Sequence, residues 1–180
     1  MIRFDNERQR RCYERLAAWL AERPEAAIAP TDAPMFILQA GSAAVAIEVT
    51  ATDADLVLVG VWSYVATGVR LDPDLLAYLL AENQKLEFCG FALDEDNDIL
   101  LQAELLDTCT AAELHFAVDR VLAWADTYDD WIVAVWGGKR AVDVVFKQRA
   151  LPGGPMSQRA IWGRTGWGRV GDRPALEYGK

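Results

Sequence analysis

The chain has 180 residues, of which 52% are hydrophobic and 25% are charged. This length and balance are typical of one ordinary globular domain and exclude a largely disordered chain. The N-terminal residues 1–11 are rich in arginine and acids, which disfavours a signal peptide. The longest apolar run, 56–61, is far shorter than the ~20 residues that a membrane-spanning helix needs. We therefore expect a cytoplasmic protein with no membrane partner.

The net charge of −9 is unevenly distributed along the chain. Residues 139–180 hold nine Lys or Arg and three acids, a net charge of +6, whereas residues 1–138 hold nine basic residues and 24 acids, a net charge of −15. Because affinity for phosphates comes from Lys and Arg, the acidic body disfavours a nucleic-acid partner. We expect a folded domain over 1–138 and a basic, Gly- and Trp-containing tail over 139–180.

The first elements in chain order are a helix and three strands. Residues 4–22 place Leu16 and Leu20 at helical spacing, and Asp5 can cap the start of this helix. Three strand-like segments follow, at 35–40, 43–51 and 55–67. The short connections between them predict antiparallel hairpins, because parallel pairing needs a long crossover. The third segment is β-branched and aromatic on both faces, which is typical of a central, buried strand.

The second half of the predicted domain adds a helix, two strands and a long helix. Asp72 followed by Pro73 opens the first of these helices, and an acidic turn joins strands at 86–93 and 98–106. A last helix runs from Ala111 to about residue 135, behind a capping box and before a glycine pair. The order α-β-β-β-α-β-β-α predicts an α+β fold with one antiparallel sheet and helices over it.

Several parts of the segment 61–126 resemble the YbjN-like family, whose fold is that of type III secretion chaperones. The matching parts are a helix with an asparagine near its end (75–83), the strand end F-x-L-D (91–94) with its acidic turn, and a late helix that contains Ala125-Asp126. The resemblance covers roughly residues 5–138. It implies a chaperone-like α+β fold, often a homodimer, that binds peptides or partner proteins and has no agreed catalytic residues.

The aspartates Asp94, Asp96 and Asp98 have the opening spacing of a calcium loop. Such a loop needs a glycine at its sixth position and a glutamate at its twelfth, which here are Ile99 and Leu105. We therefore expect a solvated hairpin turn and no metal site.

Other candidates for chemistry are equally incomplete. The only histidine, His115, lacks a positioned nucleophile, and one histidine with three scattered cysteines cannot supply a zinc site. We expect the cysteines, at 12, 89 and 109, to be reduced thiols. The run 137–139, Gly-Gly-Lys, follows a helix, whereas a phosphate loop precedes one, so it indicates a helix stop. We expect no cofactor and no catalytic residue.

The aromatic residues are the best candidates for partner contacts, since Trp and Tyr bury large areas at little entropic cost. The candidates are Trp62, Tyr64, Trp124, Trp131, Trp136, Trp162 and Trp167. Core packing is the competing interpretation for the first five. The last two lie in the basic tail, and we expect them either to hold the tail on its own body or on a dimer mate, or to dock into a partner.

The function that these observations favour is that of a non-catalytic, chaperone-like module that binds a protein or peptide client as a homodimer. The alternative is a sensory or regulatory scaffold that binds a small ligand or a signalling partner in a compact aromatic pocket. An enzyme is disfavoured, because neither a triad, nor a metal cluster, nor a cofactor loop is visible in the sequence.

Overall fold

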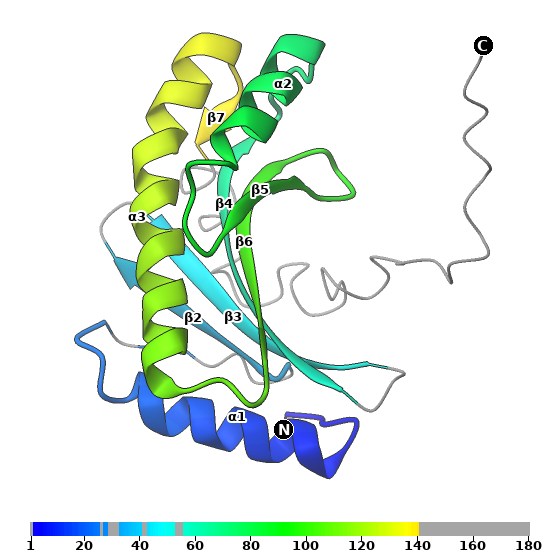
Figure 1. Cartoon of the computed structure of the whole chain (residues 1–180), viewed down its shortest axis with the longest axis vertical. Helices are drawn as coiled ribbons and strands as arrows, with labels where there is room; N and C mark the ends of the chain where they lie inside the picture. The colour runs from blue at the N-terminus through cyan, green and yellow to red at the C-terminus, as the bar shows by residue number, and fades with distance from the viewer. Residues whose placement is uncertain (1, 26, 29–32, 41–42, 53–55, 141–180) are drawn as a thin grey trace, which may run out of the picture.

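The computed structural model describes residues 2–25, 27–28, 33–40, 43–52 and 56–140 (Figure 1). Within them lie three helices and seven strands. Their order and bounds are α1 (Glu7–Leu20), β1 (Ala27–Ile28), β2 (Met35–Ala40), β3 (Ala43–Ala51), β4 (Val57–Thr67), α2 (Pro73–Glu82), β5 (Gly90–Leu93), β6 (Ile99–Leu106), α3 (Ala111–Trp136) and β7 (Lys139–Arg140). The predicted α+β class is confirmed, and the predicted order holds apart from the two-residue strands β1 and β7.

All strands pair antiparallel in one sheet of order β1-β2-β3-β4-β6-β5, with β7 beside the end of β4. The strand β4 is central, as predicted, and ten of its eleven residues are buried. The register places Ala46 of β3 opposite Trp62 of β4, and Trp62 opposite Gln102 of β6. Since side chains alternate between faces along a strand, these paired residues share one face of the sheet.

The three helices pack on the other face, which we call the helix side. Together with the inward residues of the sheet they form the main core. Its largest fully buried side chains are Leu16, Leu20, Leu38, Ile47, Leu75, Ile99, Leu101, Leu114 and Ile132. In Figure 1, α3 runs along the sheet, α1 crosses one end, and α2 lies beside the C-terminal half of α3.

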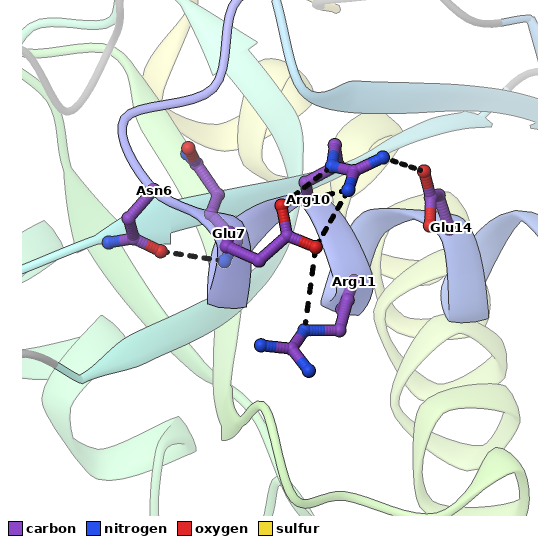
Figure 2. A network of polar contacts seen from close by, with 6 residues as sticks. Asn6, Glu7, Arg10, Arg11 and Glu14 are labelled. Carbon is purple, nitrogen blue, oxygen red and sulfur yellow. Dashed lines mark hydrogen bonds and ion pairs between the residues drawn. The ribbon is translucent and has the colours of Figure 1, made fainter.

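Helix α1 begins one residue later than the expected cap. Asn6, rather than Asp5, is the N-cap, and its side-chain oxygen accepts a 2.8 Å hydrogen bond from the backbone N–H of Gln9. The prediction of Asp5 was wrong because its side chain lies one residue too early to reach the free N–H groups of the first turn. Figure 2 shows the exposed charges that follow, where Glu7 accepts a 2.7 Å hydrogen bond from Arg10.

The strand predicted at 86–93 begins only at Gly90. The N–H of Leu86 still donates to the carbonyl of Glu82, so the helical turn continues past the end of α2. Phe88 then has a φ of 68°, a conformation that a bulky residue rarely adopts and that no strand contains. Tertiary packing thus shortens β5 to four residues.

Candidate functional site

An aromatic cluster lies where α2 meets the last turns of α3. The ring of Tyr78 is 4.5 Å from that of Trp131 and 5.3 Å from that of Trp136, measured between centroids, and the two tryptophan rings are 4.9 Å apart. Val135 is one helical turn from Trp131 and is 54% exposed. We call these four residues the aromatic patch.

Two side chains of the patch, Trp131 and Val135, are exposed, while Tyr78 and Trp136 pack against the main core. Trp131 is 41% exposed, whereas its neighbour Ile132 is fully buried against the sheet. A large aromatic side chain that stays in water beside a second exposed apolar residue is typical of a surface that binds a partner. The patch therefore offers rigid, apolar anchoring area.

Local sequence signals position the two helices that carry the patch. Asp72 caps α2 by accepting a 2.9 Å hydrogen bond from the N–H of Leu75, as predicted. Thr110 and Glu113 form the predicted capping box at the start of α3. Gly137, with a φ of 77°, ends α3 directly after Trp136. The predicted helix stop at the glycine pair thus makes Trp136 the last residue of α3.

Helix α2 is also tied to β5 by Asn83, the asparagine in the pattern that resembles the YbjN-like family. Its side-chain oxygen accepts a 2.6 Å hydrogen bond from the N–H of Phe91, and its amide nitrogen donates to the carbonyl of the same residue at 3.4 Å. Asn83 thereby satisfies the N–H and C=O groups of Phe91 on the side of β5 that has no neighbouring strand. Its side-chain amide makes the hydrogen bonds that another strand would make at this edge of the sheet.

A buried polar contact joins α2 to α3 below the patch. The hydroxyl of Tyr128 donates a 2.7 Å hydrogen bond to Glu82, which Lys85 also contacts at 2.5 Å. The hydrogen bonds from Lys85 and Tyr128 lower the pKa of Glu82, while burial and then the bond to Glu82 raise the pKa of Tyr128. Glu82 is therefore ionised at neutral pH and helps to hold the two helices together.

The face of the sheet opposite the helices, here called the outer face, carries a second apolar cluster. Met35, Ala46, Trp62, Tyr64 and Leu100 are each at most 8% exposed there. The hydroxyl of Tyr64 donates a 2.9 Å hydrogen bond to the carboxylate of Asp94 in the β5–β6 turn. Among the described residues, no helix belongs to this cluster.

The structure thus divides the sequence-derived candidates among several places. Trp131 and Trp136 come together in the aromatic patch, and Trp62 with Tyr64 lies on the outer face. Trp124 is half-buried beside Tyr128 and packs on the main core. Trp162 and Trp167 lie outside the described residues, as does most of the predicted tail.

Tyr78 and Val135 were not among the predicted site residues. Tyr78 lies between the leucines of α2, and it contacts the two tryptophans only because α2 packs on α3 in the folded chain. The spacing of Trp131 and Val135 is the signal that could have identified half of the patch, because residues four apart share a helix face.

The aspartates of the β5–β6 turn and His115, which were weighed as metal or catalytic groups, make contacts within the fold. The carboxylate of Asp94 accepts hydrogen bonds from the N–H groups of Asp96 and Asp98, at 3.0 and 2.8 Å, and so closes the hairpin turn. Nε2 of His115 lies 3.3 Å from the carbonyl oxygen of Trp19, where α3 meets α1. Within the described ranges, no three His, Cys, Asp or Glu side chains gather to hold a metal ion.

No helix in the described part of the chain is both long enough and apolar enough to cross a membrane.

Comparison with protein families identifies the class to which this fold belongs. Residues 13–144 match the family of "T3SS (YopN, CesT) and YbjN peptide-binding chaperone 1". This match covers well over half of the chain, so the chain belongs to that family, and the resemblance seen in the sequence is confirmed.

Two solved structures also align with the chain at low sequence identity. "Crystal Structure of the ExsC-ExsE Complex" aligns with a TM-score of 0.49 and 17% identity, over 69% of this chain and 95% of that chain. The "heterodimeric complex ExoU-SpcU from the type III secretion system (T3SS) of Pseudomonas aeruginosa" aligns with a TM-score of 0.40 and 16% identity, over 63% and 93%. No curated protein matches. The family assignment rests on the match over residues 13–144.

Proposed function

We propose that this protein is a non-catalytic chaperone that holds a segment of a client protein on its aromatic patch. The observation that carries the proposal is the exposed packing of Trp131 on Tyr78 and Trp136, in a chain whose family binds peptides. Rigid aromatic side chains that are already packed lose little entropy when a partner covers them. The patch is therefore suited to grip an apolar side chain of the client.

The charge of the domain indicates which client segments fit. Residues 1–138 carry a net charge of −15. Asp74 precedes Tyr78 by one helical turn on α2, and Asp130, which directly precedes Trp131 on α3, pairs with Arg140 at 3.2 Å. Complementary charge speeds encounter and excludes partners of the same sign. The expected client segment is accordingly apolar at its centre and basic at its ends.

A homodimer is the second part of the proposal. Leu76 and Leu80 are 38% and 70% exposed, and since they are four residues apart they share one face of α2. A two-fold dimer needs a surface that is complementary to itself, which a short leucine strip on a helix provides. The expected interface is α2 against α2 of a second copy. A Leu80→Ser variant that sediments as wild type does would contradict this interface.

A cytoplasmic location completes the proposal. The three cysteines, which are free thiols in the structure, support a reducing compartment.

The test is to tag the full chain in its native cell and identify what co-purifies with it. Wild type should retain one dominant protein, and Trp131→Ala should lower its recovery about tenfold, because an interface anchor is worth about 2 kcal/mol or more. Phe116→Ala is the matched control, since Phe116 is also an aromatic residue of α3, is 40% exposed and packs on another exposed ring, that of Phe88, away from the patch. Its recovery should equal that of wild type.

Two outcomes would overturn the proposal. If wild type recovers only itself, the obligate-client role is excluded and the regulatory scaffold with a small ligand becomes the better hypothesis. Equal losses in Trp131→Ala and Phe116→Ala would show that the patch is not the client site.

A further inference from the structure

No residue of a described helix belongs to the apolar cluster of the outer face. Trp62 is 4% exposed there, and its indole N–H, like that of Trp124 beside the main core, has no hydrogen-bond partner among the described residues. A buried donor without a partner is costly, so an acceptor for the indole of Trp62 would stabilise the fold. The same face holds Glu48, which is 9% exposed and paired across the sheet with Gly60.

The centre of this face is built from small residues. Gly60 lies between Glu48 of β3 and Glu104 of β6, and Ala46 lies beside Trp62 in the next row. A glycine inside a central strand leaves room for another chain to approach the sheet closely. The row through Gly60 therefore places a residue without a side chain between two carboxylates, with the unsatisfied indole of Trp62 in the adjacent row.

We propose that residues 141–180 of the same chain pack on the outer face, with Trp162 or Trp167 over Gly60. A backbone carbonyl of this segment would accept the hydrogen bond from the indole of Trp62. Basic side chains of the segment would pair with Glu104, which is exposed.

The place where the described chain ends supports this occupant. Strand β7 pairs Arg140 with Ala66, near the end of the central strand that carries Trp62. From Ala66 back to Gly60 the strand spans about 20 Å, at ~3.3 Å per residue. The stretch from Arg140 to Trp162 can extend to about 70 Å, which is ample for a folded-back path.

Charge complementarity supports it as well. Residues 141–180 contain seven Lys or Arg and three acids. Arg164 and Arg169 lie on either side of Trp167 in the sequence, and Glu104 is an exposed carboxylate beside Gly60. A ring over the glycine would add apolar burial, and an arginine would pair with Glu104.

Photo-crosslinking in the full-length protein tests this contact. The variant Gln102→p-benzoylphenylalanine places the crosslinker beside Trp62 on the outer face, and Phe116→p-benzoylphenylalanine places it on the exposed side of α3 as the control. Mass spectrometry should find residues 141–180 joined to position 102 and not to position 116. Adding Trp162→Ala and Trp167→Ala should lower this yield at least tenfold, since the two substitutions remove the aromatic rings that would cover Gly60.

A mixture of ¹⁴N- and ¹⁵N-labelled protein identifies which chain supplies the segment. Crosslinks within one isotope support the proposal, and crosslinks between isotopes overturn it in favour of a second copy. An absent crosslink from position 102, or a yield that the tryptophan changes leave intact, also overturns it. Leu106, which is half-exposed on the same face, gives a second crosslinking site if the Gln102 variant is unstable.

Discussion

Both faces of the sheet carry apolar side chains, but the described helices pack on one face only. On the helix side, Leu101 and Val61 are fully buried under three helices. On the outer face, their neighbours in the chain, Leu100 and Trp62, are 5% and 4% exposed in a cluster to which no described helix belongs. One face is thus closed by regular elements with well-placed caps, whereas the other has a glycine and a buried carboxylate on its central strands and no described helix in its cluster. The first is built for stability and the second for contact with a further segment.

The largest loss of stability should come from truncating a residue of β6 that faces the helices, compared with its neighbour on the outer face. Leu101→Ala removes a fully buried side chain from the main core and should lower the free energy of unfolding by about 3 kcal/mol. Leu100→Ala should cost less, about 2 kcal/mol, because Leu100 belongs to the smaller of the two apolar clusters. Urea unfolding measures both values. A larger loss for Leu100→Ala than for Leu101→Ala would contradict this ranking of the two clusters.

The buried carboxylate of the outer face should make stability depend on pH. Burial raises the pKa of Glu48 to about 7, whereas an unfolded chain has the ordinary value near 4.5. The folded state then binds the extra proton between these values, so stability falls as pH rises from about 4.5 to 7. A shift of this size corresponds to roughly 3 kcal/mol.

The variant Glu48→Gln stays neutral and should remove that slope. Unfolding measured in urea at pH 5 and at pH 7.5 checks it, and a wild-type slope that survives the substitution would assign the effect to another group.

The turn after α3 packs closely on the end of β4 because residue 138 is a glycine. Its φ is 87°, and an added Cβ would lie 2.7 Å from the carbonyl oxygen of Thr67 and from a methyl of Val69. Gly138→Ala should therefore cost about 2 kcal/mol, from both the strained φ and the clash. Gly68→Ala is the control, since Gly68 also has a positive φ but no atom within 4 Å of the added Cβ, and it should cost about 1 kcal/mol. Thermal unfolding compares the two.

The smallest effect should appear at the sheet edge on the helix side. Asn83→Ala removes both hydrogen bonds to the backbone of Phe91 and should cost about 1 kcal/mol. Hydrogen exchange at the amide of Phe91 should accelerate, while Gln84→Ala, at an exposed position next in sequence, should leave it unchanged. Unchanged exchange in Asn83→Ala would mean that the amide of Phe91 is protected by other contacts.

Local signals allowed much of the fold to be predicted. The cap at Asp72 and the capping box at Thr110 depend on neighbouring residues only, and both were correct. The start of β5 was not predictable, because no local sequence signal indicates the positive φ of Phe88. The two-residue strands β1 and β7 also escaped prediction, since they exist only through pairing with β2 and β4.

The candidate site was predicted in part. The tryptophans of α3 were identified from their chemistry, but the sequence could not separate Trp131 from Trp124, which the fold places on the main core. Trp62 and Tyr64 could not be assigned to a face, because β4 is apolar on both. Tyr78 was missed because its contact with α3 is made only by the tertiary structure.

The most direct test of the proposed client site follows the indole N–H signals of the tryptophans by ¹H–¹⁵N NMR during titration with the client segment recovered by co-purification. The signals of Trp131 and Trp136 should shift together with the same saturation curve, and the signal of Trp62 on the outer face should stay in place. A shift of Trp62 while Trp131 and Trp136 stay unchanged would move the client to the outer face and contradict the account.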